Sequence, residues 1–347
     1  MTDLAPHELR TLVAVEEERS FTAAAARLGT TQSAVSHAVR ACERKLGTVL
    51  FDRGRHGARP TEGGARAVAY ARRILRLLDA MGPEVRGAGA DGPLTGTLRI
   101  AAFRSAAAHL LPPVLARLAE RHPGLGTRVR IVRELGRGSA GEVADGRADL
   151  GLATLDAGGP PPVPGLVAVR LYEESYALAH PQGHPAPREL PLVDWDENCG
   201  SYTRDWWQRQ DWIPPATVDV EDDTVAVSLV AQGLGMAIMP RTTLLGAPPG
   251  LAVTDLGPRP PSRSVGYVTT PELAGTPAVR ALIRELRELP LPAGLVAARP
   301  SAAGSAATAT RTPVTAPAPA AAQSPTASQP PTASRSLRNS SASPSRV

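Results

Sequence analysis

Apolar and polar residues alternate with helical spacing between positions 20 and 53, and the rest of the chain can be organised around this stretch. Residues 22–28 are rich in alanine, the strongest helix former. A second helix is predicted from Thr31, a favourable N-cap, to the residue before Gly47, which ends it. The turn between the helices is short and contains Gly29. Two helices joined by such a turn are typical of a helix-turn-helix.

The second of these helices has two different faces. Apolar residues recur at helical spacing along one side, at Val35, Val39, Cys42 and Leu46. The opposite side is polar and is predicted to be exposed, at Gln32, Ser33, Ser36, His37, Arg40 and Arg44. Side chains of these types can reach base edges in the major groove of B-DNA. The alternative is an ordinary amphipathic hairpin with a solvated face, because helix-turn-helix matches also arise by chance.

A basic, glycine-rich segment follows the second helix. Residues 54–59 read Gly-Arg-His-Gly-Ala-Arg. A loop of this composition directly after a recognition helix can act as a wing that contacts phosphates. We predict that Arg53 and Arg55 make these phosphate contacts.

The residues of this region resemble the LysR-type transcriptional regulators in identity, order and spacing. The resemblance is carried by Ser20-Phe21, Ala25-Ala26, Leu28, Gln32-Ser33-Ala34-Val35-Ser36, Leu46-Gly47, Leu50-Phe51-Asp52-Arg53 and Thr61-Glu62-Gly63-Gly64. It implies a winged helix-turn-helix that binds double-stranded promoter or operator DNA. The chain departs from the family at Cys42, Pro60 and Gly63, where Leu, an apolar residue and Ala are usual. None of these changes removes a DNA-facing group.

A long helix is predicted from Thr61 to Met81, before Gly82-Pro83. Its apolar residues alternate in steps of three and four, as in a coiled coil, at Val68, Ala71, Leu75 and Leu78. A helix of this length has little core of its own to lie on, so we predict that the seam contacts a partner chain. Packing on its own first domain is the alternative. The resemblance implies that this linker helix pairs with its twin in a homodimer or homotetramer.

From Thr97 onward, short apolar strands alternate with helices. Strands are predicted at 97–103, 128–133 and 149–153, with helices at 106–121 and 139–145 between them. This order predicts a parallel sheet with helices on both faces. In the second half, strands are predicted at 166–171, 176–179, 233–240 and 265–269, and helices at 224–232 and 276–289. Trp206, Trp207 and Trp212 are expected on a helix as core residues.

This region resembles the LysR-type effector domain. The resemblance is carried by Leu110-Leu111-Pro112, Arg121-His122-Pro123, Gly146-Arg147-Ala148-Asp149 and Gly233-Leu234-Gly235-Met236-Ala237-Ile238-Met239-Pro240. It implies two α/β lobes joined by two crossing strands, with a small effector in the cleft between them. By position, the implied effector-binding residues are Ser105, Ser201 and Thr203. Since Ser105 follows a strand and begins a helix, we predict a small polar or anionic ligand there.

The predicted fold class is therefore α plus α/β, in four parts. They are a winged helix-turn-helix at 1–62, a linker and dimerisation helix with a hinge at 63–92, a two-lobed effector-binding domain at 93–292 whose second lobe covers about 167–266, and a disordered tail at 293–347. From Pro300 the tail contains Ala, Pro, Ser, Thr and a few Arg. Such a composition cannot offset the entropy of ordering the chain.

Charge is unevenly distributed along the 347 residues, whose net charge is +5. Residues 1–90 have 14 Lys+Arg and 10 Asp+Glu, residues 91–296 have 19 and 23, and residues 297–347 have 5 and none. A basic N-terminal part suits a polyanionic partner, whereas the acidic middle does not. The chain shows neither a signal-peptide pattern nor an apolar run of about 20 residues, so we expect a cytoplasmic protein without membrane contact.

The sequence favours neither a cofactor nor a metal nor a catalytic site. Cys42 and Cys199 are the two cysteines, too few for a zinc site of thiolates. The acidic residues at 219–223 could bind a cation, but helix capping explains them more simply. The alternatives to a regulator are a small-molecule-binding α/β module and an enzyme without a DNA role. The sequence shows no HExxH, GxSxG or P-loop motif for an enzyme.

Overall fold

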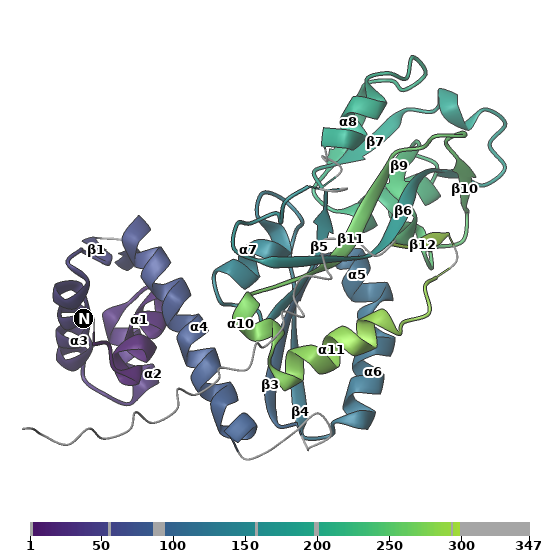
Figure 1. Cartoon of the computed structure of the whole chain (residues 1–347). Helices are drawn as coiled ribbons and strands as arrows, with labels where there is room; N and C mark the ends of the chain where they lie inside the picture. Colours follow the sequence, from purple (N-terminus) through teal and green to yellow (C-terminus); the bar gives the residue numbers. More distant parts are fainter. Residues whose placement is uncertain are drawn as a thin grey trace, which may run out of the picture. The chain divides into compact units, whose positions relative to one another are not determined.

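The computed structural model describes most of the chain up to position 298. The described residues are 3–54, 57–85, 94–156, 159–197, 201–292 and 294–298. They form a helical N-terminal domain with a two-stranded hairpin, one long helix, and an α/β domain (Figure 1). The predicted fold class is confirmed for this part of the chain. The tail was predicted to begin at position 293, but residues Leu295–Ala297 form a strand of the α/β domain, so the prediction was wrong for them. From position 299 onward the predicted tail lies outside the described residues.

The described residues of the N-terminal domain form three helices and a hairpin. These are α1 (Pro6–Glu18), α2 (Phe21–Leu28), α3 (Gln32–Leu46), β1 (Phe51–Gly54) and β2 (Gly57–Pro60). The predicted cap is present, because the Thr31 hydroxyl accepts a hydrogen bond from the Ala34 N–H at 3.2 Å. The Ser20 hydroxyl caps α2 in the same way, although it was not predicted as a cap. Gly29 and Gly47 end α2 and α3 with φ values of 64° and 68°, a conformation that favours glycine.

Three of the four residues of the apolar stripe predicted for α3 lie in the core of the N-terminal domain, whereas Leu46, in the last turn, is 36% exposed, so the prediction was wrong for Leu46. Val35, Val39 and Cys42 are buried against residues of α1 and α2. Burial raises the pKa of the Cys42 thiol to about 11, which keeps the thiol protonated and unreactive at neutral pH. Cys42 is therefore a small core residue, as predicted. Cys199 lies outside the described residues.

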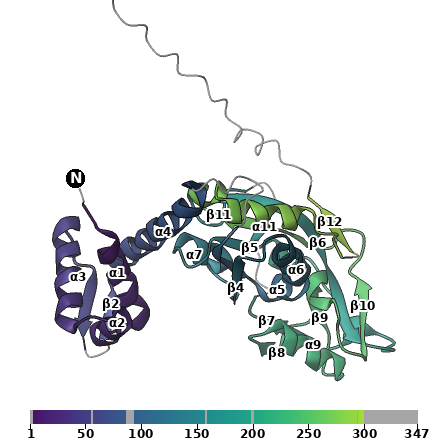
Figure 2. The same ribbon diagram turned by 90° about the horizontal axis from the view of Figure 1, so that it is seen from below.

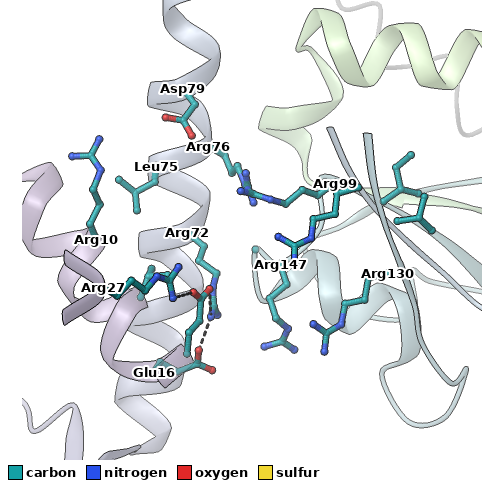
Figure 3. Close-up of a pocket in the computed structure, with 16 residues that line it drawn as sticks. Arg10, Glu16, Arg27, Arg72, Leu75, Arg76, Asp79, Arg99, Arg130 and Arg147 are labelled. Atoms are coloured by element: carbon teal, nitrogen blue, oxygen red, sulfur yellow. Dashed lines mark hydrogen bonds and ion pairs between the residues drawn. The ribbon is translucent and has the colours of Figure 1, made fainter. Parts of the chain in front are cut away.

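The long helix α4 (Glu62–Val85) follows the hairpin. The Thr61 hydroxyl accepts a hydrogen bond from the Gly64 N–H at 2.9 Å and caps its first turn. The helix was predicted to end at Met81, before Gly82-Pro83, but it continues to Val85. Pro83 lies in its last turn, where the missing N–H removes one hydrogen bond and does not end the helix earlier. The Arg72 guanidinium fastens α4 to α1 through an ion pair with Glu16 at 2.5 Å (Figure 3).

The predicted partner-binding seam of α4 is only partly exposed. Val68 and Ala71 are buried in the N-terminal domain, where α4 packs on α1, so the prediction was wrong for these two residues. Beyond them the helix extends past α1 and its apolar side chains become exposed. These exposed apolar residues are Tyr70, Ile74, Leu77, Leu78, Met81 and Val85.

The α/β domain is built on a mixed sheet with the strand order β10-β6-β11-β5-β3-β4, and β9 and β12 also pair with β6. The strands are β3 (Gly96–Ala102), β4 (Leu125–Ile131), β5 (Leu150–Leu155), β6 (Val167–Pro181), β9 (Ala237–Pro240), β10 (Leu251–Asp255), β11 (Ser262–Thr269) and β12 (Leu295–Ala297). The pairing of β3 with β4 and β5 is parallel, as predicted. The pairing of β11 with β5 and β6 is antiparallel.

The strand β6 connects the two lobes of this domain. Its first part, from Val167 to Ser175, pairs with β11 in the first lobe, and its last part pairs with β9 and β10 in the second lobe (Figure 1). Two separate strands were predicted here, at 166–171 and 176–179, because Glu173-Glu174-Ser175 interrupts the apolar pattern. That prediction was wrong, since the strand runs through these polar residues.

Helices cover both faces of the first-lobe sheet. On one face lie α5 (Arg104–His109), α6 (Leu111–Arg121) and α11 (Pro277–Arg287), and on the other lies α7 (Gly138–Ala144). Figures 1 and 2 show α6 and α11 side by side, where the Arg117 Nε and the Glu285 carboxylate form an ion pair at 2.9 Å. A short helix, α10 (Pro271–Ala274), precedes α11.

The second lobe adds a small parallel sheet and two helices. These elements are β7 (Leu192–Trp195), β8 (Ala216–Val220), α8 (Ser201–Trp207) and α9 (Asp223–Ala231). Two single-turn 3-10 helices, η1 and η2, lie at Pro187–Glu189 and Arg241–Leu244. Trp206, Trp207 and Trp212 pack partly buried on the second-lobe core, as expected, although Trp212 lies beyond α8.

Candidate DNA-reading surface and effector cleft

The exposed face of α3 carries most of the residues that the sequence singled out. Gln32 and Ser33 lie in its first turn, and His37 and Arg40 lie one and two turns further along; all four are exposed. The Ser33 hydroxyl lies 3.0 Å from the hydroxyl of the cap residue Thr31. The face therefore presents amide, hydroxyl, imidazole and guanidinium groups to solvent, and all of these can hydrogen-bond to base edges.

Ser36 does not belong to this exposed face. Its side chain is only 6% exposed, so its predicted position on the polar face was wrong. Ser36 is next to Val35 and three residues before Val39, so helical geometry places it at the border of the apolar stripe. A serine is small enough to be covered at that border, whereas His37 is not.

Two arginines of α3 differ from the paired cations of the N-terminal domain, which include Lys45 in the last turn of α3 itself. Arg40 and Arg44 form no ion pair with any carboxylate among the described residues. By contrast, the Lys45 ammonium bonds to the Glu8 carboxylate at 2.7 Å and Arg27 bonds to Glu17 at 2.5 Å. Arginines without a local counter-charge remain available for phosphates or guanines.

The hairpin of β1 and β2 occupies the position predicted for the wing. Arg53 lies opposite Ala58 in its backbone register, and the side chain of Arg53 and all of Arg55 lie outside the described residues. Arg59, on β2, is exposed and has no ion pair within the described part of the chain. It was noted in the basic segment but was not among the predicted phosphate contacts.

Gly57 fixes the hairpin against the end of α1. Its φ is 87°, and a Cβ at this position would lie 2.3 Å from the Arg19 carbonyl oxygen. The same oxygen accepts a hydrogen bond from the Ala58 N–H at 2.8 Å. In the sequence, Gly57 is simply part of the basic, glycine-rich segment. In the structure, a glycine is required at this position because the backbone passes close to Arg19.

A cavity of about 250 Å³ lies between the two lobes of the α/β domain. Its first-lobe wall comes from residues that follow the carboxyl ends of β3, β4 and β5, as expected for ligand sites in parallel sheets. The second lobe closes the other side. The lining residues are Phe103, Arg104, Ser105, Glu134, Leu135, Gly136, Thr154, Asp156, Tyr176, Trp195, Glu197, Asp223, Pro240, Thr243 and Arg263. We call this cavity the effector cleft.

The predicted effector-binding residues have different positions. Ser105 lines the effector cleft but is buried, and its hydroxyl lies 3.4 Å from the Thr242 hydroxyl. Thr203 is not among the described lining residues; its side chain is fully buried in α8, and its hydroxyl oxygen has no hydrogen-bond partner among the described residues. The predicted loop at this point begins α8 instead, and the side chain of Ser201 lies outside the described residues.

The sequence reading missed the carboxylates of the effector cleft. Glu134 follows β4, Asp156 follows β5 and Glu197 follows β7. The rule that ligands bind beyond the carboxyl ends of parallel strands was applied only to the first strand. Applied to the other predicted strands, it would have pointed to Glu134 and to Asp156, whereas Glu197 follows β7, a strand that the sequence did not predict.

The acidic residues at 219–223 act mainly through capping and ion pairing. The Asp222 carboxylate accepts a hydrogen bond from the Thr224 N–H at 2.8 Å and caps α9, as predicted. Asp223 forms an ion pair with Arg104 across the effector cleft. A search of the described residues finds no group of three or more His, Cys, Asp or Glu side chains that could hold a metal ion.

The described part of the chain includes no helix with both the length and the apolar character needed to cross a membrane.

Known families match both folded regions. Residues 6–65 match the bacterial regulatory helix-turn-helix protein family of LysR type, and residues 91–290 match the LysR substrate binding domain. A probable HTH-type transcriptional regulator, LrrA, of Synechococcus elongatus is 36% identical over 81% of this chain and 96% of its own length.

Solved structures show the same architecture. A full-length OxyR from Pseudomonas aeruginosa has a TM-score of 0.65 and 21% identity, over 86% of this chain and 100% of that one. The regulator CbnR, solved as a complex with its target DNA, has a TM-score of 0.56 and 22% identity, over 82% of this chain and 99% of that one. At these identities the similarity concerns the fold.

Proposed function

This chain belongs to the LysR family of bacterial transcriptional regulators, and we propose that it reads its operator with the exposed face of α3. Within this DNA-binding, effector-modulated family, the observation that carries the proposal is the pairing state of the cations. Arg40 and Arg44 are exposed without a carboxylate partner among the described residues, while Arg27, Lys45 and Arg72 are held in ion pairs. A polyanion would supply the missing counter-charge.

The side chains of the reading face have different roles in this proposal. Gln32 pairs with an adenine, and Arg40 pairs with a guanine or a phosphate, since these are the groups their donors and acceptors match. Ser33 and His37 contact bases or phosphates near the N-terminal end of α3. Arg53 and Arg55 contact phosphates from the hairpin. Because Ser36 is buried, we propose that it packs beneath the reading face and does not make the base contact predicted from the sequence.

We further propose that α4 joins two copies of the chain. Its exposed apolar side chains include Tyr70 (63% exposed), Met81 (55%) and Val85 (79%). Apolar residues along one helix favour association with another apolar surface. A second copy of α4 would present the same surface, which is compatible with a homodimer or a homotetramer.

In this proposal the α/β domain regulates the DNA-binding domain. A small molecule binds in the effector cleft between the lobes and alters promoter binding or activation. No role as an enzyme is assigned to the chain. Because operator DNA in a bacterium lies in the cytoplasm, the protein acts there.

The test compares binding of full-length variants to a randomised operator library. Gln32→Ala should lose about 1–3 kcal/mol at one base position and relax the preference there. Arg40→Ala should lower the affinity, at one base position if Arg40 contacts a guanine and for all sequences alike if it contacts a phosphate. Arg280→Ala is the matched control, since Arg280 is an exposed arginine of α11 without an ion pair among the described residues. If neither α3 variant changes the preferred sequence or the affinity, α3 does not read DNA and the proposal fails.

A further inference from the structure

Both arginines that line the effector cleft are already paired with carboxylates. Arg104 forms ion pairs with Asp222 at 2.9 Å and with Asp223. The Arg263 Nε donates a hydrogen bond to the Glu174 carboxylate at 2.7 Å, and that carboxylate is completely buried. An anionic ligand would have to displace one of these carboxylates before it could bind either guanidinium.

Carboxylates outnumber guanidiniums around the effector cleft. Four carboxylates line it, at Glu134, Asp156, Glu197 and Asp223, against the two guanidiniums. The next arginine outward, Arg133, is bonded to the Asp196 carboxylate at 2.6 Å and brings no uncompensated positive charge. The electrostatic potential of the cleft therefore favours a cation.

Glu197 has unused hydrogen-bonding capacity on the wall of the effector cleft. Its Oε2 accepts a hydrogen bond from the Glu134 N–H at 3.3 Å. Its Oε1 is buried and receives no hydrogen bond from any described residue, although it forms a long ion pair with the Arg133 Nε at 3.6 Å. A buried carboxylate oxygen without a donor is destabilising, and a ligand N–H group would satisfy it.

In Glu134, by contrast, both carboxylate oxygens accept hydrogen bonds. One oxygen accepts hydrogen bonds from the Ser139 N–H at 3.0 Å and the Ser139 hydroxyl at 2.9 Å, and the other accepts one from the Thr154 N–H at 3.0 Å. Glu134 therefore holds the first-lobe wall together. The Thr154 hydroxyl, like the Glu197 Oε1, is buried without a hydrogen-bond partner among the described residues. These two groups mark where a ligand would bond.

Aromatic rings also contribute to the wall. Phe103, Tyr176 and Trp195 line the effector cleft. Aromatic faces attract cations, and the Phe103 ring already does so, with the Arg263 guanidinium 4.9 Å from its centroid. The volume of about 250 Å³ restricts the ligand to a small molecule.

We propose that the effector is a small organic cation, with an ammonium or guanidinium group bonded to Glu197 and Thr154. This inference rests on the proposed function, because it names the ligand class of the same cleft. The anionic ligand predicted from the sequence depended on the N-terminus of the helix after β3. That helix, α5, has only 6 residues, and the carboxylates around it oppose an anion.

Three probes of equal carbon-chain length test the ligand class on the full-length protein. Putrescine has two ammonium groups, γ-aminobutyrate has one ammonium and one carboxylate, and succinate has two carboxylates. At constant ionic strength, thermal stabilisation and calorimetric affinity should be greatest for putrescine and absent for succinate. Equal or stronger binding of succinate, or the absence of putrescine binding at millimolar concentration, overturns the proposal.

Two variants locate the binding event. Glu197→Gln should weaken putrescine binding by about tenfold or more, because it removes the charge from a charge-assisted hydrogen bond. Asp219→Asn is the matched control, since Asp219 is an exposed carboxylate on β8 that does not line the effector cleft. An equal loss in both variants would indicate nonspecific electrostatic attraction and would overturn the assignment of Glu197.

Operator affinity, measured with and without each probe, separates this inference from the proposed function. If succinate binds and shifts operator affinity, the effector cleft is regulatory but the cationic class is wrong. If putrescine binds through Glu197 and operator affinity does not change, the cationic class stands and the regulatory role of the cleft fails.

Discussion

The reading face of α3 and the effector cleft both contain arginines, but these arginines differ in what they contact. Arg40 and Arg44 are exposed and have no carboxylate partner among the described residues. In the cleft, Arg104 and Arg263 are held by carboxylates, one of them completely buried. The comparison teaches that a basic residue indicates an anionic partner only where its charge has not already been neutralised by the fold.

The acidic end of α1 explains why some cations of the N-terminal domain are neutralised while Arg40 and Arg44 are not. Glu16 and Glu17 are adjacent in α1, and both lie in ion-pair range of Arg72, while Glu17 also pairs with Arg27. These carboxylates neutralise the cations that brace α1, α2 and α4. Lys45, in the last turn of α3, is likewise paired with Glu8 of α1, whereas Arg40 and Arg44 of α3 form no ion pair among the described residues and keep their charge for a partner.

The largest expected effect comes from breaking the buried pair of the effector cleft. Glu174→Gln would leave the Arg263 guanidinium, itself 10% exposed, without its buried counter-charge. Breaking a buried ion pair typically costs about 3–5 kcal/mol. We expect a loss of this order in the free energy of unfolding, measured by urea denaturation of the full-length protein, together with new binding of succinate.

Glu173→Gln is the control for this variant. Glu173 precedes Glu174, but its side chain is 48% exposed and its ion pair with Arg170 is long, at 3.9 Å. Such a pair contributes about 0–1 kcal/mol. If the two variants lose equal stability, Glu174 is not an essential counter-charge for Arg263. The contrast between the paired arginines of the effector cleft and the unpaired arginines of α3 would then be weaker.

A smaller effect is expected from pH. Burial raises the pKa of Glu197 above its ordinary value, and Asp223 raises it further; the hydrogen bond from the Glu134 N–H and the charges of Arg104 and Arg133 act in the opposite direction. A raised pKa means that the carboxylate gains its proton earlier as pH falls. The proton removes the charge that attracts a cation, whereas an alkylammonium keeps its own charge throughout this range.

Putrescine affinity should therefore fall as pH is lowered from about 7.5 to about 5, because only the ionised carboxylate favours the cation. Calorimetric titration at several pH values measures this dependence. The Glu197→Gln variant should show a flatter profile, since it lacks the titrating group. An affinity that rises toward acidic pH would be inconsistent with a cation held by Glu197.

The sequence was sufficient where local interactions determine the structure. The alanine content of residues 22–28, the cap at Thr31 and the apolar spacing that follows it predict two helices, α2 and α3, that the structure contains. The first-lobe strands β3 and β5 were found for the same reason, because buried parallel strands are short apolar runs, whereas the exposed edge strand β4 was predicted at 128–133 and lies at Leu125–Ile131. The two family resemblances added the two-lobed arrangement.

The sequence was insufficient where distant residues determine the structure. The strand β6 passes through Glu174 because Arg263, 89 positions further on, and Thr242 supply its hydrogen bonds. No local pattern predicts such partners. The effector cleft has the same property, since Glu134, Glu197 and Asp223 come from three separate elements. Ser36 was misplaced because a small polar residue at the border of an apolar stripe can be covered.

The smallest expected effect concerns Arg59, the exposed arginine of β2. A cation on the wing that contacts one phosphate releases about one counterion, so Arg59→Ala should reduce the slope of log affinity against log salt concentration by about one. The preferred operator sequence should not change, because phosphate contacts carry no base information. Binding of a fixed operator at several salt concentrations measures the slope, with Arg280→Ala as control. Should Arg59→Ala change the base preference while the slope stays constant, Arg59 reads bases, and the division between a base-reading helix and a phosphate-contacting hairpin is wrong.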